Sequence, residues 1–133
     1  MSNISASQLY ASSPDTVWSL VGDPQKFAAW HPAVSQSEVE GATRRCTLAD
    51  GATIIEEIVR HSDSDRSYSY RIVESPLPIR DYVSTLRVEP DGQGARLTWE
   101  SEFEAVGAPA DEVETMLRGL YQAGLDSLAA HLG

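Results

Sequence analysis

The stretch SPDTVWSLVGDPQKFAAWHP, residues 13–32, contains two helix starts in succession, followed by an aromatic residue and a histidine set against a proline. The dipeptides Ser13-Pro14 and Asp23-Pro24 each place a capping side chain before a proline at the first helical position. Pro32 ends the second helix, because the residue before a proline is disfavoured in the α conformation. The stretch therefore predicts two short helices, over about 14–21 and 24–30.

The segments on either side of these helices are of the β type. NISASQLYA (3–11) alternates in character and predicts a strand. Turn residues, of which Asp50-Gly51 is the clearest hairpin signal, separate six later segments and make neighbouring strands antiparallel. The six segments, rich in Val, Ile, Thr and Tyr, are AVSQSEVE (33–40), TRRCTLA (43–49), ATIIEEIVR (52–60), RSYSYRIVE (66–74), IRDYVSTLRVE (79–89) and ARLTWESEFEA (95–105).

Apolar residues recur every three to four positions after Gly107 and predict one long C-terminal helix. The element order is therefore β-α-α-β₆-α, an α+β fold with seven antiparallel strands, and residues 1–133 are expected to form a single domain. A twisted sheet of this size curls, and the long helix fills its concave face. Space left between sheet and helix is a common kind of small-molecule pocket.

Composition excludes several classes of partner. Ten Lys and Arg against twenty Asp and Glu give a net charge of −10, which excludes nucleic acid and disfavours anionic membrane surfaces. No apolar run is long enough for membrane insertion, and the N-terminus shows no secretory signal pattern. The single cysteine, Cys46, cannot form an internal disulfide. A cytoplasmic location is the expectation.

Strand periodicity predicts which side chains face the helix. In the last three strands one parity is aromatic with interspersed hydroxyls, while the other carries most of the charged residues. In 52–60, where Ile54 and Ile55 compete, we take Ile54, Glu56 and Ile58 as inward. The candidate ligand-binding residues are Trp30, His31, Glu56, Tyr68, Tyr70, Tyr82, Ser84, Leu86, Trp99, Leu117, Tyr121 and Gly124.

Three of these residues are candidates for proton transfer: Glu56, Tyr82 and His31. An inward Glu56 could act as an acid or base, or anchor a ligand hydroxyl; the alternative is an ion pair with an arginine such as Arg71 or Arg80. Tyr82, like other inward tyrosines, could direct its hydroxyl at a ligand carbonyl or could serve only in packing.

His31 and Trp30 are expected where the two short helices meet the cavity mouth. Trp30 could be a packing residue that closes the core there, or a platform for a ligand. His31 could exchange a proton there, or it could be a half-exposed loop residue held extended by Pro32. Two glycines in the long helix, Gly119 and Gly124, indicate either a close approach of the sheet or space for a ligand.

No metal or cofactor is expected. The three histidines are scattered, with no helical His-x-x-x-His pair and a single cysteine. The sequence has no glycine-rich phosphate loop, no dinucleotide fingerprint and no Gly-x-Ser-x-Gly motif.

Four pieces of the chain together resemble the START-related superfamily (SRPBCC), which includes polyketide cyclases, Bet v 1-like allergens and lipid-transfer proteins. They are SPDTVWSLVGDPQKFAAWHP, TLADGATIIEEI, YSYRIVESPLP and LRGLYQAGLDSLAAHL. The chain looks most similar to the bacterial single-domain cyclase/dehydrase and lipid-transport group that includes MxaD-like proteins. Those proteins are exported, so the missing signal pattern argues against carrying over their role.

The resemblance implies a helix-grip fold with a cavity for a hydrophobic or amphipathic ligand, lipid or polyketide-like. The partner would be that small molecule, with the protein a monomer or homodimer. Two alternatives stay open: a polyketide cyclase/dehydratase-type enzyme, and a protein-interaction module like the chaperone-regulating branch of the superfamily.

Overall fold

A computed structural model describes residues 1–132 of the chain and gives the element order that the sequence predicts. The elements are β1 (Ser2–Tyr10), α1 (Pro14–Val21), the 3₁₀ turn η1 (Pro24–Lys26), α2 (Phe27–Trp30), β2 (Val34–Glu40), β3 (Thr43–Leu48), β4 (Thr53–Ser62), β5 (Ser67–Glu74), β6 (Ile79–Asp91), β7 (Gly94–Ala105) and α3 (Ala110–Leu132).

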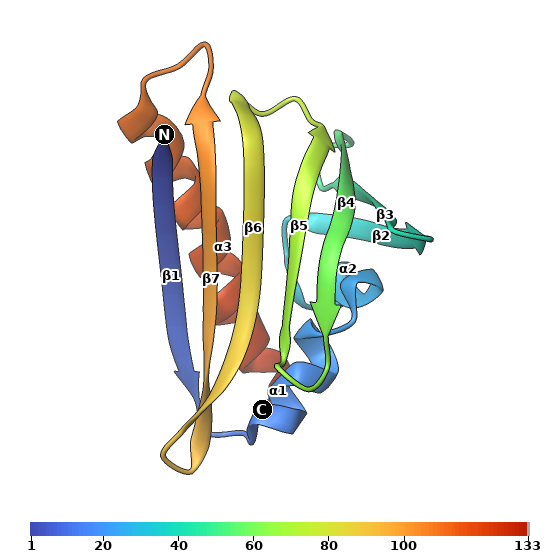
Figure 1. Cartoon of the computed structure of the whole chain (residues 1–133), viewed down its shortest axis with the longest axis vertical. Helices are drawn as coiled ribbons and strands as arrows, with labels where there is room; N and C mark the ends of the chain where they lie inside the picture. Colours follow the sequence, from blue (N-terminus) through green and yellow to red (C-terminus); the bar gives the residue numbers. More distant parts are fainter. Residues whose placement is uncertain (133) are drawn as a thin grey trace.

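The seven strands form one antiparallel sheet in the order β1-β7-β6-β5-β4-β3-β2. Figure 1 shows α3 lying along one face of the sheet, behind β1, β7 and β6, while β2 and β3 turn away from the long strands. The short helices α1 and α2 lie beside the lower half of β4 and β5 in this view. This is the expected helix-grip arrangement, a curved sheet wrapped around a long C-terminal helix.

The predicted caps explain the first helix, while the second differs from the expectation. The Ser13 side chain accepts a hydrogen bond from the Thr16 backbone N–H at 3.2 Å at the start of α1. The second predicted helix, over 24–30, is instead a 3₁₀ turn followed by one α-helical turn. Phe27 and Trp30 still share a face, are both buried, and have ring centroids 5.2 Å apart.

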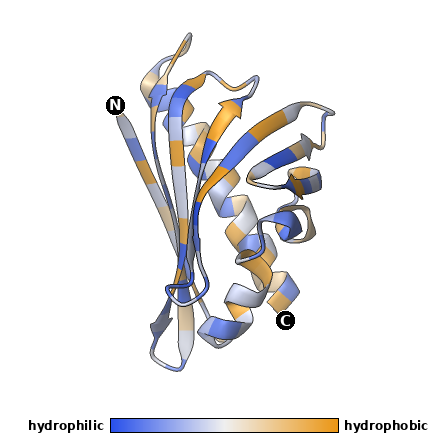
Figure 2. Ribbon diagram, turned by 45° about the vertical axis from the view of Figure 1, so that its right-hand side comes forward, coloured by the Kyte–Doolittle hydropathy of each residue, from blue (hydrophilic) through white to orange (hydrophobic). Residues whose placement is uncertain are grey.

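The core lies between the concave face of the sheet and α3, and the predicted strand parities are confirmed. The inward residues of β6 and β7 are buried, and in β4 Ile54 and Glu56 are buried, whereas Ile58, also predicted as inward, is only partly buried, as is Ile55. Figure 2 shows apolar and polar residues alternating along α3, and its buried residues recur every three to four positions. The Tyr10 hydroxyl donates to the Leu125 carbonyl oxygen at 2.8 Å and ties β1 to α3. Within residues 1–132, no helix has the length and apolar character needed to cross a membrane.

Candidate functional site

A cavity of about 70 Å³ lies between the sheet and the first half of α3. Its walls come from α2, from the segment that follows it, from strands β2 to β7 and from α3, so they bring together residues far apart in the sequence. The lining residues are Phe27, His31, Ala33, Val34, Leu48, Ile54, Glu56, Tyr70, Ile72, Leu77, Tyr82, Trp99, Leu117, Leu120 and Tyr121. Glu56 is the one acidic residue among them, and no lysine or arginine is present.

Partly exposed apolar side chains mark the mouth of the cavity: Ala33, Leu48, Ile72, Leu77 and Leu120. They belong to the α2–β2 connection, to the end of β3, to β5, to the β5–β6 loop and to α3. The predicted mouth at Trp30 and His31 is wrong, because these residues are only 1% and 4% exposed. Their side chains pack inward because α2 is pressed against α3, so this part of the chain closes the cavity.

The structure separates the twelve predicted ligand-binding residues into two groups. Seven of them line the cavity: His31, Glu56, Tyr70, Tyr82, Trp99, Leu117 and Tyr121. The other five are buried but do not line it: Trp30, Tyr68, Ser84, Leu86 and Gly124. Strand parity identified the inward face correctly, but an inward residue can contact other core side chains in place of the cavity, as Ser84 does in accepting from Trp99.

Glu56 forms a buried ion pair with Arg44, whose Nε lies 2.7 Å from the Glu56 Oε1. The two residues are directly opposite each other in the β3–β4 ladder, on the inward face. The predicted alternative of an ion pair with an arginine is confirmed, but neither example named for it is the partner. Arg71 and Arg80 pair with Glu57 and Glu104 on the outer face. Arg44 was missed by the sequence analysis, although counting back from the Asp50-Gly51 turn places it near Glu56.

The guanidinium of Arg44 is fully buried behind Glu56 and does not line the cavity. Its Nη1 donates to the Pro24 carbonyl oxygen and to the Tyr68 hydroxyl, both at 3.1 Å, while Nη2 has no hydrogen-bond partner within residues 1–132. The ring of Phe27 lies 4.6 Å from its Cζ atom. Burial opposes the charge of Arg44, but Coulombic interactions with Tyr68 and Glu56 outweigh it and raise its pKa.

Cys46 completes this buried cluster from the same face of β3. Its thiol donates to the Glu56 Oε1 at a sulfur–oxygen distance of 3.4 Å. Burial, with the Glu56 carboxylate beside it, raises the pKa of the Cys46 thiol to about 12. The sulfur therefore stays protonated at neutral pH and serves as a hydrogen-bond donor, not as a nucleophile.

His31 has both ring nitrogens occupied by the backbone. Its Nδ1 accepts from the Ala33 N–H at 3.1 Å, so the proton is on Nε2, which donates to the Leu120 carbonyl oxygen at 2.8 Å. Burial lowers the pKa of the imidazole, although the bond to Leu120 opposes this shift. The prediction of a half-exposed loop residue is wrong: His31 is a buried link between the α2–β2 connection and α3.

Three tyrosine hydroxyls form a chain across the cavity wall. Tyr121 donates to the Ser101 hydroxyl at 2.9 Å, so the Tyr82 hydroxyl, which is hydrogen-bonded to that of Tyr121, is the donor of that pair. Tyr70 in turn donates to Tyr82 at 3.4 Å. Trp99 stacks on Tyr121 with ring centroids 4.1 Å apart, and its Nε1 donates to the Ser84 hydroxyl at 2.9 Å.

The pKa of each of these tyrosines is raised, in each case chiefly by burial. The phenols therefore remain protonated at neutral pH, and the cavity holds no phenolate base. The side-chain donors of the wall are all directed at other protein groups. What the cavity offers chemically is an apolar surface with one carboxylate.

The eight lining residues that were not predicted as ligand-binding are all apolar: Phe27, Ala33, Val34, Leu48, Ile54, Ile72, Leu77 and Leu120. Ile54 was predicted as inward, Ile72 has the inward parity of the segment 66–74, and Leu120 falls in the apolar spacing of the predicted C-terminal helix. Leu77, from the loop over the mouth, carries no periodic signal. Its position depends on how that loop folds back over the sheet.

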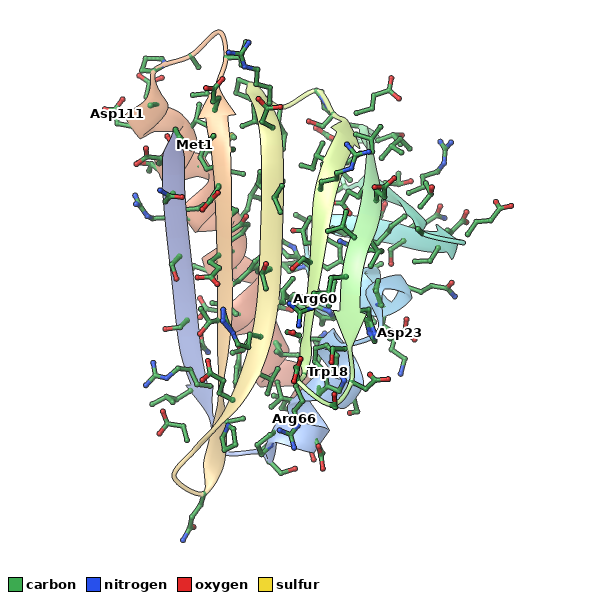
Figure 3. The ribbon with its side chains drawn as sticks, viewed as in Figure 1. Met1, Trp18, Asp23, Arg60, Arg66 and Asp111 are labelled. Atoms are coloured by element: carbon green, nitrogen blue, oxygen red, sulfur yellow. The ribbon has the colours of Figure 1, made fainter. Side chains whose placement is uncertain are left out.

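A larger groove of about 780 Å³ opens on the outside of the molecule, between α1 and η1 on one side and β2, the β2–β3 turn and β4 on the other. Figure 3 shows Trp18, Asp23 and Arg60 around the lower part of β4. The indole Nε1 of Trp18 donates to Asp63 at 2.9 Å, and His61 lies 2.6 Å from the Gly22 carbonyl oxygen. Charges of both signs line this groove, and it is open to solvent.

Solved structures similar to this chain share its fold over nearly the whole length. XoxI from Bacillus cereus is 29% identical with a TM-score of 0.96, covering 99% of this chain and 96% of that protein. A START superfamily protein from Mycobacterium smegmatis is 13% identical, with a TM-score of 0.85 and coverage of 98% and 96%. The major latex-like protein 151 from Panax ginseng is 20% identical, with a TM-score of 0.82 and coverage of 99% and 97%.

A search of curated proteins found no match. The family model described as polyketide cyclase / dehydrase and lipid transport matches residues 1–133. Together with the seven-stranded sheet, the long C-terminal helix and the cavity between them, this match assigns the family. The chain belongs to the family described as polyketide cyclase / dehydrase and lipid transport, and it shares the fold of the START superfamily protein.

Proposed function

We propose that this protein binds a small apolar or amphipathic molecule in the cavity between its sheet and α3. The observation that carries the proposal is the cavity wall itself, where aliphatic and aromatic residues surround a single carboxylate. Ligand sites generally combine such an apolar lining with a few placed polar groups. The family and the fold support the same class of ligand.

The volume of the cavity limits the size of the ligand that it can enclose. At about 70 Å³ it is far below the roughly 300–1,000 Å³ of a typical drug-sized pocket. It is also below the ~150 Å³ of an engineered cavity that holds benzene. A ring-sized ligand must therefore displace side chains at the mouth, where Leu48, Ile72, Leu77 and Leu120 are partly exposed. A longer chain would extend through this mouth into solvent.

The enzyme alternative, a cyclase or dehydratase, finds less support in the geometry. His31 has no free nitrogen for proton transfer, and the raised pKa values of the tyrosines leave no phenolate. Glu56 is the remaining proton-transfer candidate on the wall. No described feature favours a protein-interaction module, since the exposed large apolar residues of 1–132 are spread over β1, β4, β5, β6, the β7–α3 loop, α3 and the N-terminus.

The binding proposal is tested by titrating the purified protein with 4-fluorotoluene and following the ¹⁹F NMR signal. Ala33→Leu adds three carbons at a partly exposed position of the cavity wall, so we expect it to abolish binding. Ala29→Leu makes the same change at an exposed position of α2 outside the cavity and should leave binding intact. Failure of the wild-type protein to bind, or equal binding by both variants, would overturn the proposal.

A further inference from the structure

We propose, building on that function, that the cavity selects small uncharged ligands that carry a hydroxyl donor, and that Glu56 Oε2 is the atom that accepts it. The site would then prefer ligands that donate a hydrogen bond over ligands that can only accept one, such as carbonyl compounds and carboxylates. Three observations support the inference: the free carboxylate oxygen, the committed donors of the wall, and the position of Arg44.

Glu56 presents one unused acceptor to the cavity. The residue is 4% exposed and lines the cavity. Its Oε1 accepts from both Arg44 and Cys46, whereas Oε2 accepts no hydrogen bond from any group of residues 1–132. Because Oε2 is not among the fully buried unpartnered atoms, it keeps accessible surface at the cavity wall. A ligand hydroxyl that reaches it gains a charge-assisted hydrogen bond in an apolar setting.

The side-chain donors on the wall are already committed. Tyr70 donates to Tyr82, Tyr82 to Tyr121, and Tyr121 to Ser101, so each phenol proton has its acceptor. The remaining two N–H groups, on His31 and Trp99, are bound to a backbone carbonyl oxygen and to the Ser84 hydroxyl. A ligand carbonyl would therefore enter the cavity without a side-chain donor to replace its hydrogen bonds to water.

The position of Arg44 excludes anions. Its guanidinium is fully buried behind Glu56 and does not line the cavity, so it compensates the carboxylate without offering a cation to the ligand. A ligand carboxylate would face Glu56 directly and would lose its hydration with no opposite charge in reach. The wall thus presents an acceptor but no cation and no free side-chain donor.

The test compares four rings with ¹⁹F labels that differ at one position: 4-fluorophenol, 4-fluorotoluene, 4-fluorobenzaldehyde and 4-fluorobenzoate. We expect the phenol to bind about ten-fold more tightly than the toluene, the size of one hydrogen bond to a charged acceptor. The aldehyde should bind more weakly than the toluene, and the benzoate should not bind. A toluene, aldehyde or benzoate that binds as well as the phenol overturns this inference but leaves the binding function; no binding by any ring overturns both.

Two variants identify the atoms. In Glu56→Gln the amide oxygen takes the Oε1 position facing Arg44 and Cys46, so the amide N–H group replaces Oε2. The preference should then invert, with the aldehyde bound more tightly than the phenol. Tyr121→Phe removes the link to Ser101 and frees one phenol proton of Tyr70 or Tyr82, which should raise aldehyde affinity while the phenol keeps its Glu56 acceptor. An unchanged aldehyde affinity in Tyr121→Phe, or an unchanged ranking in a folded Glu56→Gln, overturns the assignment. If Glu56→Gln fails to fold, the wild-type series and Tyr121→Phe still test it.

Discussion

At the residue scale, the Arg44–Glu56 pair is the most consequential feature of the interior. Both side chains are removed from water, and their attraction must offset the cost of desolvating two charges. Arg44 contacts five residues: Glu56, Pro24, Tyr68 and the rings of Phe27 and Tyr70. The pair therefore links η1 and α2 to the β3–β4–β5 part of the sheet while it fixes the carboxylate at the cavity wall.

Removing one partner should be far more damaging than removing both. Arg44→Met leaves the Glu56 carboxylate buried without a cation, and we expect the free energy of unfolding to fall by about 3–5 kcal/mol. The double variant Arg44→Met/Glu56→Leu replaces both charges by apolar side chains and should recover most of that loss. Urea unfolding followed by tryptophan fluorescence measures both. Equal destabilisation in the two variants would show that the ion pair is not the source of the effect.

His31 should make stability depend on pH. Because burial lowers its folded pKa below the usual 6.5, the unfolded chain binds the proton more readily as pH falls. The contribution of neutral His31 to the free energy of unfolding is fully present above pH 6.5. It is lost as the pH falls from 6.5 through the lowered pKa of the folded protein. Over this window the free energy of unfolding should fall by up to about 1.4 kcal/mol per pH unit.

The control for this prediction is His31→Asn, which keeps His61 and His131 but removes the buried imidazole. The variant is expected to be less stable at pH 8, with a shallower decline between pH 6.5 and 5, in urea unfolding at each pH. A wild-type curve that runs parallel to that of the variant would contradict the role given to His31.

At the element scale, α3 packs closely against α2 at Gly124, which has no side chain. A Cβ atom added at Gly124 would lie 2.6 Å from Cδ2 of His31 and 3.1 Å from Cζ3 of Trp30. The element that approaches Gly124 is therefore α2 with the residue after it, and not the sheet. Of the two predicted roles, close packing and space for a ligand, Gly124 serves close packing. Gly119 is exposed and a Cβ there would meet nothing within 4 Å.

The two glycines therefore predict opposite effects of the same substitution. Gly119→Ala should stabilise the protein by about 0.5–1 kcal/mol, because alanine has the higher helix propensity and nothing obstructs it. Gly124→Ala should destabilise it in spite of the same propensity gain, because the buried His31 and Trp30 rings must move. Thermal unfolding of the two variants provides the measurement. A stabilised Gly124→Ala would contradict the packing described for α2 and α3.

Most elements could be predicted because their signals are local. Alternation gave the inward faces of β5, β6 and β7, and the Ser13-Pro14 cap gave the start of α1. The Arg44–Glu56 pair was missed because it depends on the register between β3 and β4. A shift of one residue in that register would move the side chains of one strand to the other face of the sheet. The mouth was misplaced because the burial of Trp30 and His31 depends on the packing of α2 against α3, a contact between residues about ninety positions apart along the chain.

At the scale of the whole molecule, two hollows compete as ligand sites. The inner cavity is small, closed by α2 and lined by apolar residues around Glu56. The outer groove beside Trp18 and His61 is larger, but it is open and lined by charges of both signs. Burial of apolar ligand surface favours the inner cavity in spite of its size, because affinity for such a ligand comes from removing that surface from water.

A crystal of the protein pressurised with xenon tests this choice most directly. Xenon is apolar and small, and it enters dry apolar cavities of proteins without needing a hydrogen-bond partner. We predict anomalous density for xenon between Leu117 of α3 and Ile54 of β4, inside the cavity. Density confined to the outer groove beside Trp18, or no xenon in the cavity, would contradict an apolar ligand site between the sheet and α3.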